Sequence, residues 1–251
     1  MRQGFLIPVY NHGKTALPIA RGLAEKNLPI ILVDDGSGEE TKEYLNKTAA
    51  AFPQARLVTL EKNRGKGGAV SAGIRKAREL GLTHVLQIDA DGQHDARRAA
   101  YFLEQSNLHP GAVICSYPEY DEAAPASRKN GRIIANTWAK IVTLSPEIRD
   151  AMCGFRVYPV EPVWELIHRH HLDCRMGFDI EILVRLYWEN IPLIFHPIRV
   201  SYPEDGISHF HAVRDNTRIS WVFTRLFFGM LARFPILLRR ACARRKQGLH
   251  R

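Results

Sequence analysis

Short apolar runs alternate with longer amphipathic runs through the first half of the chain, and this alternation limits the possible folds more than any other feature. The apolar runs have the length and the Val, Ile and Leu content of buried strands, and they cover residues 4–9, 29–34, 55–60, 84–89 and 111–116. The intervening runs have helical spacing and cover residues 14–26, 39–51, 67–80 and 95–106. Repeated strand–helix units predict an α/β fold with a doubly wound, mostly parallel sheet.

The second half of the chain is less regular. Helical patterns surround a short CGFRVYP segment and are followed by a late strand and a surface loop. The helical patterns cover residues 131–144, 160–170 and 178–188, the strand 191–200 and the loop 201–211. No repeat, low-complexity linker or clear boundary precedes residue 212. We therefore expect one domain, residues 1–211, followed by a helical tail, residues 212–251.

Composition and charge narrow the class of protein. The hydrophobic content of 45% and the charged content of 24% are ordinary for a globular protein, which excludes disordered and collagen-like chains. Four cysteines without a CxxC pair exclude a disulfide scaffold and indicate a reducing compartment. The net charge of +9 is local, because nine basic residues and no acidic residue follow Asp215. This distribution argues against a nucleic-acid-binding surface and for an anionic contact at one end of the chain.

The tail contains the most apolar segment of the chain, residues 219–238. Arg225 and Arg233 interrupt this segment and Pro235 is expected to break it, which argues against a helix that spans a bilayer. One or two amphipathic helices in a membrane interface, with the following RRACARRK on anionic headgroups, fit the pattern. The alternative is a helix packed on the body of the protein or on a second subunit, as in a homodimer.

Polar residues follow the predicted strands at their carboxyl ends, which is where sheets of this kind bind ligands. Asp89 and Asp91 in IDADGQHD stand one residue apart at a strand end, with Gln93 close by. Their oxygen atoms suit Mg²⁺ or Mn²⁺ holding a diphosphate, and the alternative is a polar turn. An EF-hand is excluded because its glycine and final glutamate positions hold His94 and Ala100.

Two further segments at the same edge can bind a nucleotide. Asp34 and Asp35 end the second predicted strand, where a carboxylate can accept hydrogen bonds from a base or ribose, or can instead cap the next helix. NRGKGGAVSAG (63–73) opens a helix and offers Lys66 and free backbone N–H groups to an anion, with a plain tight turn as the alternative. It matches neither a Walker A loop nor a dinucleotide-binding fingerprint.

Taken together, these segments resemble the family 2 glycosyltransferases of GT-A fold, and within them the polyprenyl (dolichyl)-phosphate sugar synthases. The matching motifs are PVYN (8–11), VDDGS (33–37), NRGKGGA (63–69), DADGQH (89–94), CGFRVYP (153–159) and GFDIEIL (177–183). The resemblance implies a Rossmann-like sheet and a metal-dependent, inverting transfer from a GDP- or UDP-sugar. It implies that the nucleotide is held by Pro8, Tyr10, Asn11, Asp34, Asp35, Lys66 and Asp89. It also implies that Mg²⁺ or Mn²⁺ is held by Asp89, Asp91 and Gln93.

The nature of the acceptor has two interpretations. A lipid phosphate needs only cations to position it, whereas a hydroxyl acceptor also needs a general base. Candidates for a phosphate site are Arg128, Lys129, Arg132, Arg156 and Ser208, and candidates for a base are Asp150, Asp179, Glu181, Glu204 and Asp205. In the loop that reads YPEDGISH here, the synthases carry an Arg and then Gly-x-Ser-Lys. This chain lacks both cations and has Glu204 and Asp205 instead, which favours a hydroxyl acceptor.

The sequence thus predicts an enzyme that transfers a sugar to a membrane lipid resembling a polyprenyl phosphate, peripherally on the cytoplasmic face of the cell membrane. Residues 1–211 would be its GT-A catalytic domain, and residues 212–251 a basic amphipathic tail. The residues assigned to catalysis are Asp91, Asp150, Arg156, Glu204 and Asp205. The alternatives are the same donor chemistry with a hydroxyl acceptor, on a glycolipid or a soluble molecule, and a membrane-associated scaffold whose site is inactive.

Overall fold

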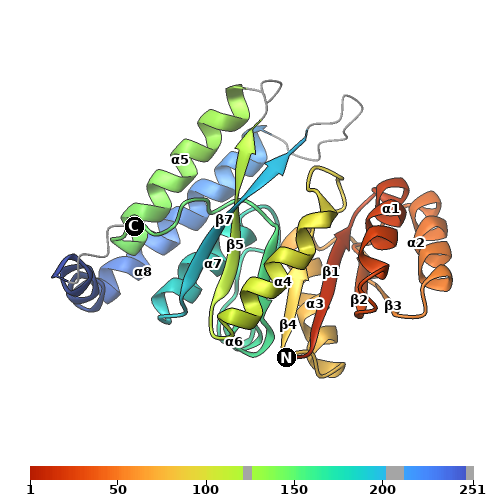
Figure 1. Cartoon of the computed structure of the whole chain (residues 1–251). Helices are drawn as coiled ribbons and strands as arrows, with labels where there is room; N and C mark the ends of the chain where they lie inside the picture. The colour runs from red at the N-terminus through yellow and green to blue at the C-terminus, as the bar shows by residue number, and fades with distance from the viewer. Residues whose placement is uncertain (121–125, 202–211, 247–251) are drawn as a thin grey trace.

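A single mixed sheet forms the centre of the molecule (Figure 1). The computed structural model describes residues 1–120, 126–201 and 212–246, and within them the strand order is β3-β2-β1-β4-β6-β5-β7. Neighbouring strands are parallel, except that β6 is antiparallel to β4 and to β5. The strands are β1 (Gln3–Val9), β2 (Ile30–Asp34), β3 (Ala55–Thr59), β4 (His84–Gln87), β5 (Val113–Tyr120), β6 (Arg156–Pro159) and β7 (Leu193–Val200).

Helices cover both faces of this sheet. Successive residues of β1 point to opposite faces, so Leu6 joins one apolar core while Phe5 and Ile7 join the other. The helices are α1 (Gly13–Ala24), α2 (Glu39–Ala51), α3 (Lys66–Glu79), α4 (Ala99–Leu108), α5 (Ala126–Thr143), α6 (Val160–Arg169), α7 (Phe178–Trp188) and α8 (Ala212–Lys246). The core with Leu6 includes residues of α3, α5, α6, α7 and α8, and the core with Phe5 includes residues of α1, α2 and α4.

The predicted α/β fold with a mostly parallel, doubly wound sheet is confirmed. Every strand and helix expected within the described residues is present, with ends shifted by a few residues. One strand was not predicted, since β6 lies inside CGFRVYP and pairs between β4 and β5. A strand of four residues carries too little periodicity to be read from sequence, and its antiparallel direction depends on partners that are distant in the chain.

The prediction that Pro235 breaks the tail helix is wrong, because α8 continues through it. Proline inside a helix removes one backbone hydrogen bond and crowds the preceding turn, at a cost of about 3 kcal/mol. Contacts on both sides of Pro235 offset this cost. Met230 and Leu237 are buried in the core, and Arg240 donates a hydrogen bond of 2.9 Å to the carbonyl oxygen of Trp188.

The helix α8 has two different faces. Its inner face adds Val222, Phe223 and Leu226 to the core that also contains α5 and α7. Its outer face leaves large apolar side chains exposed, and these include Trp221, Phe228, Leu231, Phe234, Ile236 and Leu238. By length and composition alone, the span Val213–Arg244 would also qualify as a helix that crosses a membrane, as the buried core helices of soluble proteins can.

The strand order fixes the place where a ligand can bind. From β1 the chain moves outward to β2 and β3 and then returns to place β4 on the other side of β1. In sheets of this kind a crevice opens at the carboxyl ends of the strands where the order reverses. The loops after β1 and β4, which carry Tyr10 and Asp89, therefore face each other across this crevice.

Candidate active site

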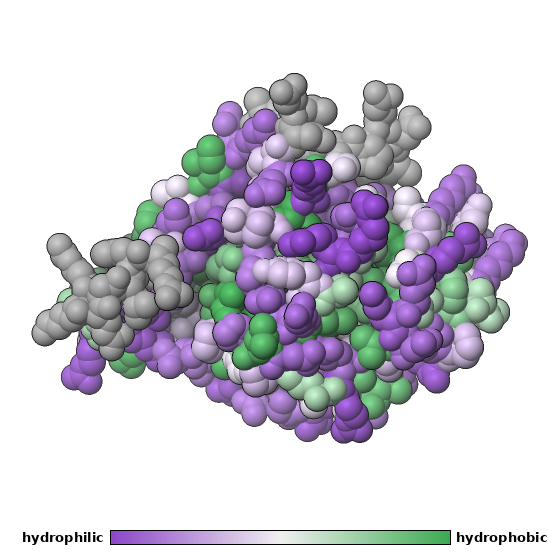
Figure 2. Space-filling view, in the orientation of Figure 1, coloured by the Kyte–Doolittle hydropathy of each residue, from purple (hydrophilic) through white to green (hydrophobic). Residues whose placement is uncertain are grey.

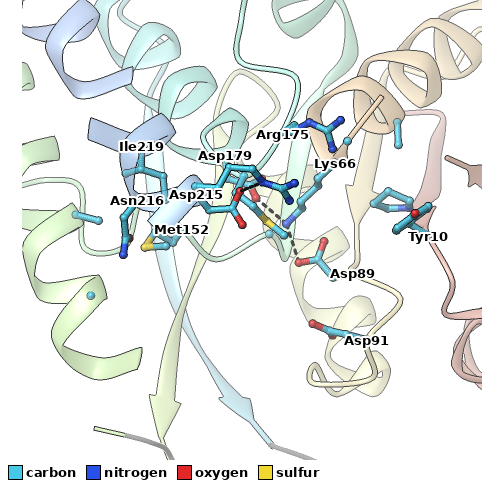
Figure 3. A pocket seen from close by; sticks show the side chains of 18 of the residues that line it. Tyr10, Lys66, Asp89, Asp91, Met152, Arg175, Asp179, Asp215, Asn216 and Ile219 are labelled. Atoms are coloured by element: carbon cyan, nitrogen blue, oxygen red, sulfur yellow. Dashed lines mark hydrogen bonds and ion pairs between the residues drawn. The ribbon is translucent and has the colours of Figure 1, made fainter. Parts of the chain in front are cut away.

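A cavity of about 1530 Å³ lies over the crevice. Its polar wall comes from the loops after β1, β2 and β4 and from the first turns of α3 and α7 (Figure 3). Its apolar wall comes from α5 and α8. The predicted site residues that line it are Pro8, Tyr10, Asn11, Asp35, Lys66, Asp89, Asp91, Gln93, Arg132 and the candidate base Asp179. The fold thus brings the predicted nucleotide and metal residues to one place.

Lys66 joins two carboxylates in the polar wall, as the dashed lines of Figure 3 show. Its Nζ lies 2.7 Å from Oδ2 of Asp89 and 2.6 Å from Oδ2 of Asp179. Lys66 is the first residue of α3 and Asp179 lies in the first turn of α7. Gly154 packs directly against the Lys66 ammonium, because a Cβ at this position would lie 2.5 Å from Lys66 Nζ. A side chain at this position would displace the ammonium of Lys66 or the carboxylate of Asp89.

The charges in this group stabilise one another. Burial lowers the pKa of Lys66, but the carboxylates of Asp179 and Asp89 outweigh burial and raise it. Burial raises the pKa of Asp89, but Lys66 and His94 outweigh burial and lower it. Lys66 is therefore an ammonium and Asp89 a carboxylate at neutral pH. Asp91 also lines the cavity, so a further carboxylate is present on the same side as Asp89.

The two carboxylates after β2 organise the neighbouring loops. Asp35 accepts hydrogen bonds from the backbone N–H groups of Arg64 and Gly65, at 2.7 and 2.8 Å. Burial raises the pKa of Asp35, against these hydrogen bonds. Asp34 accepts a hydrogen bond of 2.9 Å from the N–H of Ser37 and does not line the cavity. Asp34 thus shapes the turn before α2, whereas Asp35 holds the loop that leads to Lys66 and also faces the cavity.

The predicted metal ligands offer hard oxygen atoms. Asp91 Oδ1 accepts a hydrogen bond of 3.0 Å from the backbone N–H of Gln93, which fixes this turn beside Asp89. Among the described residues, no group of three or more His, Cys, Asp or Glu side chains could hold a metal ion by itself. Mg²⁺ is commonly bound by one or two carboxylates together with substrate phosphates. The donor set of Asp89, Asp91 and Gln93 fits a cation of this kind that arrives with a diphosphate.

Asp150 and Arg156 lie behind the cavity lining. The Asp150 carboxylate accepts two hydrogen bonds from Nη1 of Arg132, at 2.8 and 2.7 Å, and two more from backbone N–H groups of the following turn. Arg156 is fully buried and donates to the carbonyl oxygens of Ala151 and Asp179. In this structure Asp150 orients Arg132, and Arg156 supports the backbone beneath Asp179.

Other predicted residues lie outside the described part of the chain. These are Glu204, Asp205 and Ser208, together with the side chain of Arg128. Their assignments stay predictions.

The cavity also contains Arg175, Asp179, Arg214 and Asp215, of which the sequence singled out only Asp179, as one of several bases. These four residues begin or precede α7 and α8. The sequence gives no local signal that these helix starts face β4.

Comparison with known proteins decides the family. A sequence model described as Glycosyl transferase family 2 matches residues 5–167, which is more than half of the chain. The chain belongs to glycosyl transferase family 2. The predicted family is therefore confirmed.

Curated relatives of this family member match most of its length. A dolichyl-phosphate beta-glucosyltransferase from Homo sapiens is 30% identical over 178 residues, which cover 65% of this chain and 53% of the relative. An undecaprenyl-phosphate mannosyltransferase from Micrococcus luteus is 28% identical over 198 residues, covering 74% of this chain and 77% of the relative. The chain spans between 52% and 58% of the three dolichyl-phosphate beta-glucosyltransferases from Trichomonas vaginalis, Dictyostelium discoideum and Homo sapiens.

Solved structures support the GT-A fold. Glucosyl-3-phosphoglycerate synthase from Mycobacterium tuberculosis, in complex with Mn²⁺, UDP and phosphoglyceric acid, aligns with a TM-score of 0.66 and 14% identity, covering 91% of this chain and 78% of the other. Mannosyl-3-phosphoglycerate synthase from Rubrobacter xylanophilus aligns with a TM-score of 0.62 and 17% identity, covering 100% and 76%. At these identities the similarity shows the fold alone.

Proposed function

We propose that this family member transfers a sugar from a nucleoside-diphosphate donor to a polyprenyl-phosphate-like lipid at a membrane surface. The observation that carries the proposal is the cavity itself, which joins the charged group of Lys66, Asp89 and Asp91 to an apolar wall. That wall contains Trp138 of α5 and Phe227 of α8. A charged head and a long apolar chain on one acceptor would use both parts. The names of the dolichyl- and undecaprenyl-phosphate relatives support this class of acceptor.

In this proposal the donor lies along the polar wall. Pro8, Tyr10, Asn11 and Asp35 hold the nucleotide, and the start of α3 places the Lys66 side chain and the positive end of the helix beside the diphosphate. Asp89, Asp91 and Gln93 would hold Mg²⁺ or Mn²⁺, which supplies a positive charge to the diphosphate as negative charge develops there. The Lys66 ammonium adds a second positive charge from the protein. The Mn²⁺ and UDP in the Mycobacterium tuberculosis structure are consistent with this donor site.

The transfer itself needs one displacement. An oxygen atom of the acceptor phosphate attacks the anomeric carbon, and the bond from that carbon to the diphosphate oxygen breaks, which inverts the configuration. A phosphate is already an anion, so no general base is required. Arg175 lines the cavity and can position the phosphate, as can Arg214, which lies 3.7 Å from Asp215. Arg132 contributes less positive charge, because the Asp150 carboxylate already pairs with it at 2.7 Å.

The membrane contact is proposed to involve α5 and α8. Ile133, Ile134 and Trp138 are exposed on α5, and the outer face of α8 carries its own exposed apolar residues. Figure 2 shows hydrophobic surface along α5 at the upper left of the molecule, among hydrophilic neighbours. Exposed basic residues after Asp215, such as Arg239, would contact anionic headgroups of the cytoplasmic leaflet, whereas Arg225 and Arg240 are held by the protein. We retain residues 1–211 as the catalytic domain and residues 212–251 as the membrane-contacting tail, with self-association into a homodimer as the competing use of this surface.

A hydroxyl acceptor is the second candidate, and Asp215 favours it. This carboxylate on α8 lines the cavity, is only 2% exposed and lies 3.7 Å from the Arg214 side chain, and in this candidate it would accept the proton of the hydroxyl group. Of the bases predicted from sequence, Asp150 is already hydrogen-bonded to Arg132.

A transfer assay separates the candidates. Purified protein, Mn²⁺ or Mg²⁺, labelled UDP- and GDP-sugars and a total lipid extract are incubated, and label is followed into the organic phase. Lipid label that mild acid releases is the expected result, because a sugar phosphodiester is acid-labile. Acid-stable lipid label would favour a hydroxyl acceptor and make Asp215 the base to substitute. No label in lipid with any donor would contradict the lipid acceptor.

A further inference from the structure

The Lys66 ammonium lies beside an oxygen atom that the proposed divalent cation needs. Its Nζ is 2.7 Å from Oδ2 of Asp89, and the two side chains are 17% and 21% exposed. A second cation that approaches Asp89 in this arrangement meets a positive charge already in contact with its ligand. Solvent screens that repulsion weakly at such low exposure. Lys66 and a divalent cation therefore compete for Asp89.

Asp179 is a second carboxylate partner of the Lys66 ammonium, beside Asp89. Its Oδ2 lies 2.6 Å from Nζ, and its Oδ1 is buried without a hydrogen-bond partner among the described residues. A lysine ammonium has three donors on a flexible stem, so it can move off Asp89 and still donate to Asp179. Gly154 leaves no spare volume beside Nζ, since a Cβ there would lie 2.6 Å from Asp89 Oδ2 as well. Movement is therefore directed into the open cavity.

We propose that Lys66 is an internal counter-cation that neutralises Asp89 until the donor arrives. This inference rests on the proposed function, which supplies the divalent cation and the nucleoside diphosphate. Without nucleotide, the ammonium weakens the binding of the metal alone. When the diphosphate enters, it attracts the ammonium away from Asp89, and Asp179 keeps the lysine in the cavity. Metal and nucleotide then bind cooperatively, and Asp179 acts as a positioning residue for Lys66.

Binding of Mn²⁺ to the full chain without nucleotide tests the competition. The paramagnetic resonance signal of free aqueous Mn²⁺ gives the dissociation constant directly. Lys66→Met removes the competing charge and is expected to bind Mn²⁺ roughly tenfold more tightly than the wild type, a coupling of ordinary size between two sites. Lys66→Gln keeps a hydrogen-bond donor between the two carboxylates and is measured in parallel, in case the methionine variant does not fold. Lys76→Met is the matched control, because it makes the same change of net charge on the same helix outside the cavity lining.

A double-mutant cycle tests the role of Asp179. In the Asp179→Asn background the ammonium has only Asp89 as a carboxylate partner. Removing Lys66 should then increase Mn²⁺ affinity by a larger factor than in the wild type. A residue that merely supported the fold would leave that factor unchanged. In the same experiments, with the binding of Mn²⁺ to free nucleotide measured without protein and subtracted, UDP or GDP should increase the Mn²⁺ affinity of the wild type by a larger factor than that of Lys66→Met.

Two outcomes overturn the inference and are distinguishable from each other. If neither Lys66 variant binds Mn²⁺ more tightly than the wild type, there is no competition, even where the wild type binds Mn²⁺ with UDP or GDP. If the wild type binds no Mn²⁺ with or without either nucleotide, the metal in the proposed function is wrong and the inference falls with it.

Discussion

At the scale of single residues, the site depends on how closely three side chains and one glycine approach each other. Lys66, Asp89 and Asp179 come from α3, the loop after β4 and α7, and their charged atoms meet next to Gly154. The space between the Lys66 ammonium and the backbone of Gly154 is too small for a methyl group. Small changes here should therefore alter the chemistry more than the stability.

Gly154→Ala is predicted to reduce transfer by roughly 10²-fold, because an ångström-scale displacement of a catalytic group can cost this much. The added methyl group would displace the ends of Lys66 and Asp89, which are flexible, so the fold should tolerate it. Initial rates and a thermal melt check both parts. Gly131→Ala is the control, since Gly131 also lines the cavity but a Cβ there meets nothing within 4 Å. Equal activity of the two variants would contradict the crowding of this group.

Asp91→Ala is predicted to lower transfer by at least about 10²-fold, as expected when one stabilising contact to the developing charge is lost. Within the described residues its side chain accepts a hydrogen bond from the N–H of Gln93, a contact inside its own turn, so the fold should survive. Transfer rate and circular dichroism are the measurements. Asp95→Ala is the matched control, because Asp95 follows in the same loop but pairs with Arg97 outside the cavity. Retained activity in Asp91→Ala would remove the proposed metal site.

Site residues could be predicted from the sequence where they lie close together along the chain. Asp89, Asp91 and Gln93 lie within one turn, so their joint use was readable from spacing. Asp179 and Asp215 reach the cavity only because α7 and α8 pack against the sheet, which no local pattern indicates. The same packing buries Glu181, a candidate base in the sequence, where it is 0% exposed and paired with Arg185 and Arg225.

At the scale of elements, the strand–helix alternation was predictable because each unit has its own apolar period. The antiparallel direction of β6 and the continuity of α8 through Pro235 were not predictable, because both depend on tertiary contacts that outweigh local preference.

Glu181 shows how such contacts hold a helix in place. It accepts hydrogen bonds from Arg185 of its own helix and from Arg225 of α8, so it joins α7 to α8 inside the protein.

Glu181→Gln is predicted to destabilise the fold by about 3 kcal/mol, because removing one partner of a buried ion pair leaves the other charge uncompensated. Urea unfolding followed by tryptophan fluorescence measures this. Glu165→Gln is the control, since it breaks another Glu–Arg pair at the same helical spacing whose side chains are more than half exposed, and should cost only about 0.5 kcal/mol. A loss below about 1 kcal/mol for Glu181→Gln would mean that α8 is held by its apolar face alone.

At the scale of the whole molecule, α5 and α8 perform two tasks. They form the apolar wall of the cavity, and they expose large apolar residues to the surroundings, with Ile134, Trp138 and Phe228 belonging to both. Because α8 also packs Val222, Phe223 and Leu226 into the core, lipid cannot surround it while this fold persists. In the proposed membrane contact, α8 would therefore lie on the membrane with the cavity opening close to the lipid, and would not cross it.

Trp221→Glu combined with Leu231→Glu is therefore predicted to weaken binding to anionic vesicles by roughly tenfold or more, since each apolar side chain that enters a membrane contributes about 1.5–3 kcal/mol. Both residues are exposed and neither lines the cavity, so hydrolysis of the donor in water should be unchanged. Cosedimentation with vesicles of phosphatidylserine and phosphatidylcholine gives the affinity. Asn107→Glu with His109→Glu on the exposed end of α4 adds the same charge and should leave binding intact. Unchanged vesicle binding by the α8 variant, together with a shift from dimer to monomer in sedimentation velocity, would assign this surface to a second copy of the chain.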